Sequence, residues 1–314
     1  MKVPLVRMLF TPLAIAACAP QLSSERAVMA PGAPLVARTA EAPQINEHML
    51  VSAEWLAAHS GDPDLVVLHV APNRTSYDQG HIPGARFLPV SAILTEKDGN
   101  VNELPPVPQL DSVFESVGVS DNSRVVIYGP SLAAARTFFT LDYLGRGDRA
   151  ALLDGSLETW KAGGRSVSTE APRITPGSFT PRPQPERVVD ADWVNRHLRD
   201  PSIVLIDARP GAQFTGAEPG DGIARPGHIP GARNIFWENL LVSREEPRLK
   251  ELPALQALLR EAGANPGDTV VAYCRSGMQA SFAYFVARYL GYETRMYDGS
   301  FLDWSRRTSL PVER

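Results

Sequence analysis

Cysteine is scarce in this sequence, and concentrated basic patches are missing from it. Cys18 and Cys274 are the only cysteines among 314 residues, and only Cys274 lies in the part expected to fold, which excludes an intramolecular disulfide there. Lysine and arginine are scattered and the formal net charge is -4, so the positive footprint that nucleic acid requires is absent. No cluster of side chains has metal-ligand spacing. We expect small anionic or thiol substrates, and neither a metal nor a cofactor.

Long apolar runs are also missing, which bears on the N-terminus. The apolar run over residues 8–17 is preceded by two basic residues and is too short to span a bilayer, so residues 1–18 are predicted to be a signal peptide. The run ends in Ile-Ala-Ala-Cys, which resembles the lipobox of bacterial lipoproteins, whose cysteine becomes the lipidated first residue. Ordinary cleavage at the Ala-Cys-Ala pattern of residues 17–19 is the alternative. We expect export to the periplasmic side of a bacterial membrane, with lipid on Cys18 as the only membrane attachment.

An internal repeat divides the rest of the chain into two halves. The repeated segments, in the same order in each half, are Val51–Leu56 with Val189–Val194, Gly80–Arg86 with Gly227–Arg233, and Asp154–Ser156 plus Trp160 with Asp298–Ser300 plus Trp304. We therefore predict two domains, at 45–168 and 187–314. The proline-rich residues 169–186 read as a linker, and residues 19–44, which lack periodicity, read as a flexible tether, with an ordered arm as the alternative.

Short apolar runs alternate with helical stretches in each half. In the second half, Ile203–Ile206 and Val270–Tyr273 are predicted strands, while Leu255–Ala262 and Phe282–Leu290 are predicted helices. Runs of four or five apolar residues between helices are typical of a parallel sheet that is covered on both faces. The sequence thus predicts an α/β protein with two domains, each a mostly parallel sheet with helices on both faces.

Cys274 stands where a predicted strand passes into a predicted helix. Open α/β sheets place their ligands at this carboxyl edge. The free N–H groups at the helix start and the charge of Arg275 favour a thiolate, so we expect a lowered pKa for Cys274. Gly277 allows the backbone to curl, so that successive N–H groups point into one cavity. The alternative is that Cys274 is a small buried core residue.

The segment from Tyr273 to Ala280 resembles the six-residue active-site loop of rhodaneses, and the Gly-His-Ile-Pro-Gly-Ala segments resemble that family's signature. The layout is similar to the tandem thiosulfate and mercaptopyruvate sulfurtransferases from about residue 45 to 314. The resemblance implies that Cys274 is the catalytic sulfur carrier. It also implies that the rest of the loop binds the substrate, namely Arg275, Ser276, Gly277, Met278 and Gln279.

The first domain has no cysteine at the equivalent place. Gly129 aligns with Cys274, and the resemblance implies that this domain is catalytically silent, as in the family. We expect that a cysteine installed at 129 would not create a second site, because Pro130 removes one N–H group that such a loop needs.

The mechanism that the resemblance implies is a double displacement. The Cys274 thiolate attacks the outer sulfur of a donor such as thiosulfate, sulfite leaves, and a persulfide remains, held by the N–H groups of residues 275–279. A thiol acceptor, or cyanide in the test tube, then removes the sulfur.

The donor is open between thiosulfate and mercaptopyruvate. Arg275 resembles the thiosulfate-using type, which carries basic loop residues, whereas Ser276 resembles the small neutral residues of mercaptopyruvate users. Two arginines with which tandem members grip the donor have no counterpart beside Phe214 and Glu218, which leaves Arg209 and Arg225 as candidate substitutes. We expect thiosulfate.

Two functions of other classes compete with this reading. A cysteine-dependent phosphatase would need an arginine at the end of the loop, where Ala280 and Ser281 stand. A module that binds sulfur without turnover would fit the missing arginines, but the retained Cys274 and Arg275 favour an enzyme.

Three further polar residues attract attention. His81 and His228 lie in the repeated turns, one of them in the half without a cysteine, so structural hydrogen bonds are expected of both. Asp207 aligns with His69 and either orients the Cys274 loop or is a satisfied buried carboxylate.

The N-terminal reading predicts the outcome of Cys18→Ser. The variant should be released from membranes or mislocalised, because a serine cannot carry the lipid. Membrane fractionation and the mass of the mature N-terminus measure this. A Cys18→Ser protein that stays with membranes, together with a wild type that bears no acyl mass, would contradict the lipoprotein reading.

Overall fold

The computed structural model describes residues 44–314. The predicted signal peptide, the predicted lipid site Cys18 and nearly all of the predicted tether lie outside the described residues. None of the helices within 44–314 is long and apolar enough to cross a membrane.

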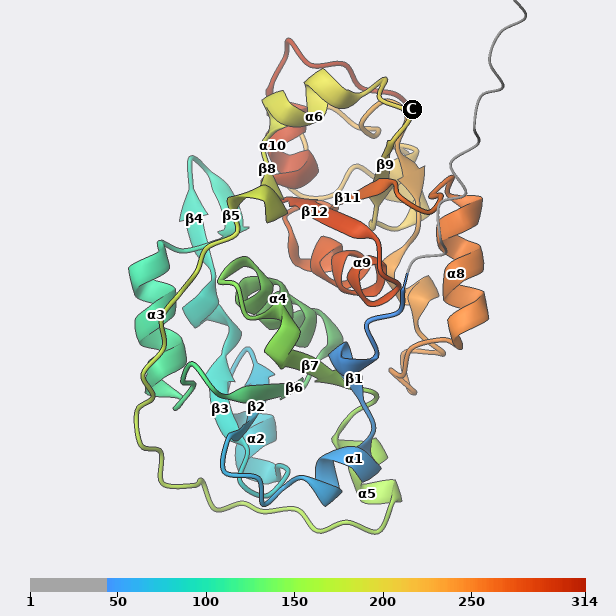
Figure 1. The fold of residues 1–314 in the computed structure, drawn as a ribbon. Coiled ribbons are helices and arrows are strands. Elements are labelled where there is room, and N and C mark those ends of the chain that lie inside the picture. Colours follow the sequence, from blue (N-terminus) through green and yellow to red (C-terminus); the bar gives the residue numbers. More distant parts are fainter. Residues whose placement is uncertain (1–43) are drawn as a thin grey trace, which may run out of the picture. The chain divides into compact units, whose positions relative to one another are not determined.

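Two five-stranded sheets form the framework (Figure 1), and neighbouring strands are parallel in both. The strand order is β1-β7-β6-β2-β3 in the first domain and β8-β12-β11-β9-β10 in the second, so the strands correspond one to one. The predicted fold class is confirmed. The first sheet comprises β1 (Leu50–Val51), β2 (Leu65–Ala71), β3 (Arg86–Pro89), β6 (Arg124–Tyr128) and β7 (Ala150–Leu153). The second comprises β8 (Val188–Val189), β9 (Ile203–Asp207), β10 (Arg233–Asn234), β11 (Thr269–Tyr273) and β12 (Glu293–Tyr297).

Helices cover both faces of each sheet. Those of the first domain are α1 (Ala53–Ala58), α2 (Thr75–Gln79), α3 (Val107–Ser116), α4 (Ser131–Tyr143) and α5 (Leu157–Ala162). Those of the second are α6 (Ala191–His197), α7 (Gly211–Phe214), α8 (Leu252–Glu261), α9 (Met278–Tyr289) and α10 (Ser300–Arg306). Single 3-10 turns occur at Glu47–Met49, Val90–Ile93, Gly147–Arg149, Pro185–Arg187 and Trp237–Leu240. The predicted N-caps are present, since Ser52 and Asp190 accept hydrogen bonds from Trp55 and Trp193.

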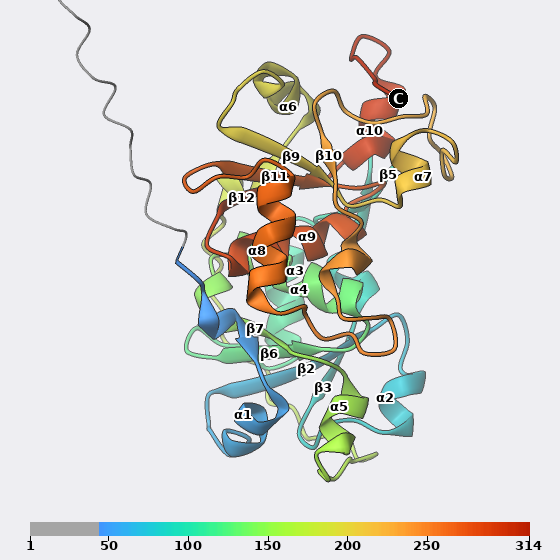
Figure 2. The ribbon, with the colours of Figure 1, turned by 90° about the vertical axis from the view of Figure 1, so that its right-hand side faces the viewer.

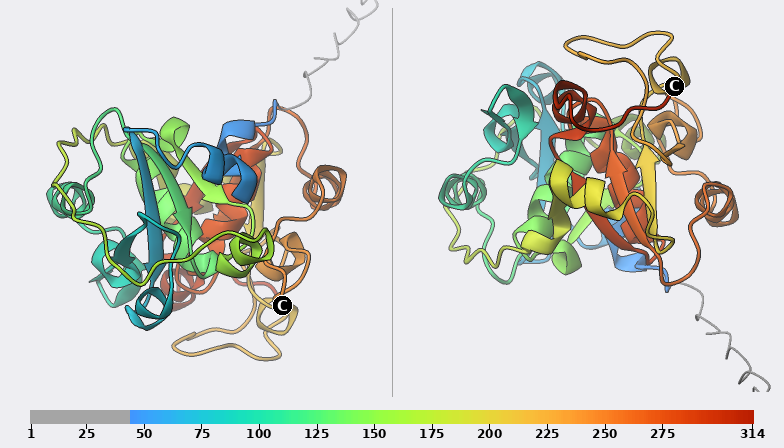
Figure 3. Two further views of the ribbon diagram at one scale, coloured as in Figure 1. Left: turned by 90° about the horizontal axis from the view of Figure 1, so that it is seen from below. Right: turned by 90° about the horizontal axis from the view of Figure 1, so that it is seen from above.

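The alternation of side chains along the strands sorts the core into layers. In β2, Val66, Leu68 and Val70 face a cluster that contains α3 and α4 and continues into α8 and α9 of the second domain. Val67 faces the opposite cluster with α1 and α5, and α6 and α10 cover the corresponding face of the second sheet. Figures 1 and 3 show α3 and α8 on opposite sides of the central pair α4 and α9, and in Figure 2 α8 lies in front of this pair.

The pair α4 and α9 joins the two domains. Phe138 stacks edge-on against Phe285 with ring centroids 4.9 Å apart, and Phe139 does so against Tyr284 at 5.0 Å. At the far end of the same pair, Asp142 accepts hydrogen bonds from the Tyr284 hydroxyl at 2.6 Å and from Arg288 Nε at 3.1 Å. The contact between the domains is therefore a packed aromatic core with a buried polar cluster at this end.

Two segments depart from the repeat. Residues 169–184 contain no helix or strand, but they lie along the first domain, where Phe179 is buried against Phe114 and Gly177 N–H bonds the Glu115 carbonyl at 2.8 Å. The first domain also has an antiparallel hairpin, β4 (Thr95–Lys97) and β5 (Asn100–Glu103). Arg306 of α10 donates to the Gly99 carbonyl at 2.8 Å, so this hairpin is docked on the second domain.

The position equivalent to Cys274 yields a prediction about stability. Gly129 has φ +133, and a side chain there would collide with the carbonyl oxygen of Val70. Gly129→Cys should therefore lower the free energy of unfolding by about 3 kcal/mol, measured by denaturant titration.

The matched control is Gly61→Cys, which adds the same thiol. A Cβ at residue 61 would have no atom within 4 Å. Its stability should be close to that of the wild type. Equal stability of the two variants would show that the backbone at 129 tolerates a side chain.

Candidate active site

The Cys274 loop, residues 274–279, runs from the end of β11 into the first turn of α9 at the carboxyl edge of the second sheet, where the sequence predicts it. Cys274 is 1% exposed. Its N–H donates to Ser300 Oγ at 3.2 Å, and its carbonyl accepts from the Phe301 N–H at 2.9 Å. The Arg275 carbonyl accepts from the Leu302 N–H at 2.9 Å. The first turn of α10 thus holds the carbonyls of the loop on one side.

The amide groups of the loop lie on the other side. The N–H groups of Ala280, Ser276 and Gln279 hydrogen-bond the Cys274 sulfur. Gly277 has φ +89, which confirms the predicted curl and which residues with a Cβ adopt rarely. The sequence predicts that the N–H groups of residues 275–279 hold the sulfur. Within that range the Ser276 and Gln279 N–H groups do so, and the structure adds Ala280, the first residue after the loop.

The expectation of a lowered thiol pKa is wrong for this state of the site. Burial raises the pKa of Cys274, the three amide hydrogen bonds lower it only in part, and the Asp207 carboxylate raises it further. The Arg275 guanidinium donates a hydrogen bond from Nη1 to the Asp221 carbonyl oxygen at 3.2 Å. Its charge is therefore held beside a neighbouring loop. Burial removes more of the hydration that stabilises the thiolate than the three amide hydrogen bonds replace.

The remaining loop side chains differ in exposure. Arg275, Met278 and Gln279 are partly exposed, whereas Ser276 is buried. Ser276 Oγ accepts a hydrogen bond of 3.0 Å from Asn102 Nδ2, which belongs to the β4–β5 hairpin of the first domain. Sequence reasoning missed Asn102, and no local signal could have found it, because 174 residues separate the two partners.

The two arginines considered as substitutes for the donor-binding arginines serve the structure instead. Arg209 is fully buried, pairs with Asp207 through Nη2 at 2.6 Å and lies over the Phe301 ring, behind the loop. Arg225 donates to four backbone carbonyls. The suggestion that Arg209 and Arg225 bind the donor is therefore wrong. Of the two interpretations of Asp207, the one that holds is a buried carboxylate whose hydrogen bonds are satisfied.

The two signature histidines have the structural role predicted for them. His81 Nδ1 lies 2.8 Å from the Tyr77 carbonyl, and His228 Nδ1 lies 3.0 Å from the Phe214 carbonyl. In both turns the next residue, Ile82 or Ile229, donates its N–H to a tyrosine hydroxyl at the end of the central strand.

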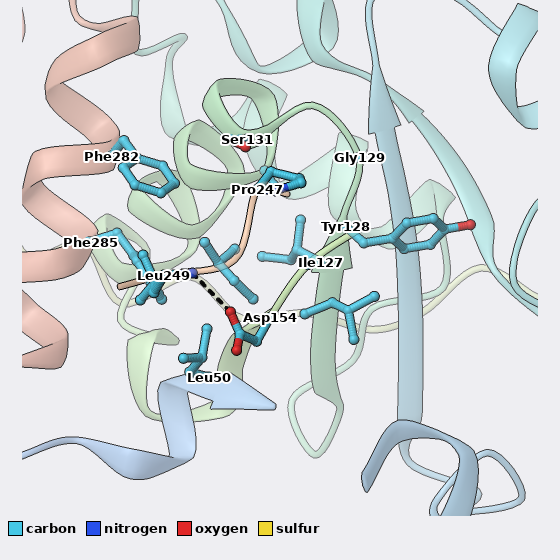
Figure 4. A pocket seen from close by; sticks show the side chains of 14 residues that line it. Leu50, Ile127, Tyr128, Gly129, Ser131, Asp154, Pro247, Leu249, Phe282 and Phe285 are labelled. Carbon is cyan, nitrogen blue, oxygen red and sulfur yellow. Dashed lines mark hydrogen bonds between the residues drawn. The ribbon is translucent and has the colours of Figure 1, made fainter. Parts of the chain in front are cut away.

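Side chains from both domains surround the equivalent place in the first domain (Figure 4). A cavity of about 20 Å³ lies beside Gly129, Asp154 and Phe282, which is enough for roughly one water molecule. Leu249 of the second domain closes it and donates its N–H to Asp154 Oδ1 at 3.0 Å. This cavity cannot hold a sulfur donor. Within residues 44–314, no group of three or more His, Cys, Asp or Glu side chains is placed to hold a metal ion.

Comparison with known proteins agrees with this geometry. The family model of the rhodanese-like domain matches residues 52–163 and again 190–307. The chain is 34% identical over 280 residues to a probable 3-mercaptopyruvate sulfurtransferase of Pseudomonas aeruginosa, covering 84% of this chain and 97% of that one. It is 30% identical over 281 residues to a thiosulfate sulfurtransferase of Corynebacterium glutamicum, covering 84% and 90%.

A solved structure shows the same arrangement. The anaerobic ergothioneine biosynthesis enzyme of Chlorobium limicola, in complex with trimethyl histidine, superposes with a TM-score of 0.76 at 26% identity. The match covers 85% of this chain and 70% of that one. A persulfide form of EanB with ergothioneine gives a TM-score of 0.77 at 25% identity, covering 86% and 71%.

Proposed function

The chain belongs to the rhodanese family of sulfurtransferases, with two copies of the rhodanese-like domain, and we propose that it takes sulfane sulfur from thiosulfate and passes it to a thiol or cyanide. The observation that carries this proposal is the buried Cys274 sulfur at the carboxyl edge of a parallel sheet. It accepts hydrogen bonds from the N–H groups of Ser276, Gln279 and Ala280. Donors fixed in this way stabilise negative charge on sulfur without moving during the reaction.

The proposed reaction balances without a cofactor. The Cys274 thiolate attacks the outer sulfur of thiosulfate, a sulfur–sulfur bond forms, and the sulfur–sulfur bond of the donor breaks with its electron pair leaving on sulfite. The enzyme then holds a persulfide anion, whose outer sulfur is attacked by the acceptor thiolate or by cyanide, and Cys274 returns as a thiolate. The thiol proton must leave Cys274 before the first attack, because burial raises the pKa of this thiol. Once the thiolate has formed, each step moves one sulfur atom and needs no further proton.

Mercaptopyruvate makes a different demand. When its sulfur is removed, the carbon that bore it becomes an enolate carbon and must take up a proton. Within the described residues, the side chain that hydrogen-bonds the Ser276 hydroxyl is Asn102, an amide that does not titrate. Arg275, which is partly exposed and follows Cys274 directly, also supplies a full positive charge. The Asn102 amide offers no proton to an enolate carbon, and the charge of Arg275 attracts a dianion. Both features support thiosulfate, whose leaving group is sulfite, over mercaptopyruvate.

We further propose that the enzyme acts outside the cytoplasm and is attached to a bacterial membrane by lipid on Cys18. The support for this is the Ile-Ala-Ala-Cys segment that ends the N-terminal apolar run.

Arg275→Ala tests the choice of donor. At about 6 Å in water, one positive charge attracts a dianion by about 1.4 kcal/mol and a monoanion by about half as much. Removing Arg275 should therefore lower kcat/KM about tenfold with thiosulfate and about threefold with mercaptopyruvate. Steady-state rates with the two donors, measured side by side, report this ratio.

Arg199→Ala is the matched control, because Arg199 is an exposed arginine that precedes β9 and so lies at the opposite edge of the same sheet. It should leave both rates unchanged. The thiosulfate proposal fails if the wild type prefers mercaptopyruvate, or if Arg275→Ala reduces both activities equally.

A further inference from the structure

Two equivalent aspartates lie at the boundary between the domains. Asp154 and Asp298 both begin the repeated Asp-Gly-Ser segment. Asp298 Oδ2 accepts the Leu104 N–H at 2.9 Å, and Asp154 Oδ1 accepts the Leu249 N–H at 3.0 Å. Each leucine comes from the other domain and stands three residues before the helix that follows it. The two aspartates are therefore equivalent in the backbone N–H group that each accepts from the other domain.

Arg136 breaks this symmetry. Its guanidinium grips Asp298 with two hydrogen bonds, Nη1 to Oδ1 at 2.6 Å and Nη2 to Oδ2 at 3.2 Å. When Leu144-Gly145 at the end of α4 is aligned with Leu290-Gly291 at the end of α9, Phe282 stands in the place of Arg136. Phe282 lines the cavity beside Asp154 (Figure 4). The arginine is therefore present only where its partner aspartate lies beside the Cys274 loop.

The Arg136–Asp298 pair touches the Cys274 loop at its left-handed turn. A methyl group added to Gly277 would lie 2.9 Å from Asp298 Oδ1 and 3.1 Å from Arg136 Nη1. No other residue of the loop has positive φ, so the pair packs at the point where the backbone reverses. The amides of Ser276 and Gln279, on either side of that turn, both bond the Cys274 sulfur.

Stability alone does not explain a pair at this place. Arg136 is fully buried and Asp298 is 3% exposed, and a buried ion pair is on average no more stabilising than apolar side chains of similar size. The other half places a phenylalanine at the same position. Arg136 Nε also has no hydrogen-bond partner within the described residues. These costs point to a role in the site.

The charge balance beneath the loop depends on Arg136. The charged groups around Glu103, which lines one cavity with Asp298, are Asp298 itself, Lys97, Arg136 and Asp303. Arg307 pairs with Asp303 at 3.0 Å. Burial, and then the charge of Asp298, raise the pKa of Glu103 to about 7. Without Arg136, this side of the loop would hold a buried carboxylate with a single amide partner and an acidic neighbour. That charge would oppose any anion on the Cys274 sulfur.

We propose that Arg136, a residue of the domain without a cysteine, is a positioning residue for the Cys274 loop: its ion pair with Asp298 fixes the Gly277 turn and balances the charge beneath it. The proposal deepens the proposed function, on which its link to turnover rests, but its first readout does not need turnover.

Arg136→Met tests the proposal, because methionine keeps most of the volume and removes the charge. The readout is the rate of Cys274 alkylation by iodoacetamide in the full chain, followed as a function of pH by mass spectrometry of the Cys274 peptide. Loss of the balancing cation disfavours the thiolate, so the midpoint should move to higher pH by about one unit, a tenfold loss of rate at pH 7. With thiosulfate, kcat should fall in parallel while KM changes little.

Asp142→Asn is the matched control. It removes the negative charge that pairs with Arg288 and binds the Tyr284 hydroxyl at the far end of the same helix pair. This variant should lower Tm without moving the alkylation midpoint. An equal shift in Asp142→Asn would show that loosening of the interface is sufficient, which would overturn the proposal.

Arg136→Lys keeps the charge but cannot grip both carboxylate oxygens in the plane of a guanidinium. It should fold even if Arg136→Met does not, keep the midpoint near that of the wild type and lower kcat about threefold. An unchanged kcat in Arg136→Lys, or an unchanged midpoint in a folded Arg136→Met, would overturn the proposal. If wild type does not use thiosulfate but the midpoint still shifts in Arg136→Met, only the proposed function fails.

Discussion

The hydrogen bonds from the first turn of α10 to the carbonyls of Cys274 and Arg275 are the constraint on which the site depends. The peptide unit is planar and trans, so fixing a carbonyl on one side also fixes the next N–H on the other. With two carbonyls engaged by Phe301 and Leu302, the backbone after Cys274 turns its amides toward the sulfur. The left-handed turn at Gly277 completes the reversal. The chemistry of the site therefore comes from backbone geometry more than from side chains.

This geometry supports the proposal that the duplicated fold has one site. Both domains have the same parallel sheet, the same strand order and the same Asp-Gly-Ser segment. In the first domain Gly129 replaces the cysteine, Pro130 removes an amide, and Leu249 closes the remaining space. The first domain is nevertheless joined to the site, because it provides the Asn102 hydrogen bond to Ser276 and the Arg136 ion pair to Asp298.

Much of this could be predicted from the sequence, and the limits have physical reasons. The repeat, the strand periodicity and the strand-to-helix position of Cys274 are local patterns, so the fold and the loop followed from them. The contacts of Asn102 and Arg136 join residues from different domains, and no periodicity encodes such pairs. The direction of the Cys274 pKa was mispredicted, because it depends on how completely the sulfur is buried. Arg209 and Arg225 were mistaken for donor ligands, since a sequence does not show which carbonyls an arginine will meet.

The central claim is that sulfur is carried on Cys274, and the mass of the protein after treatment with thiosulfate in the absence of an acceptor tests it most directly. The account predicts that the peptide containing Cys274 gains the mass of one sulfur atom, that cyanide removes it, and that Cys274→Ser neither gains that mass nor turns over. Sulfur found on another residue, or turnover by Cys274→Ser, would contradict the account.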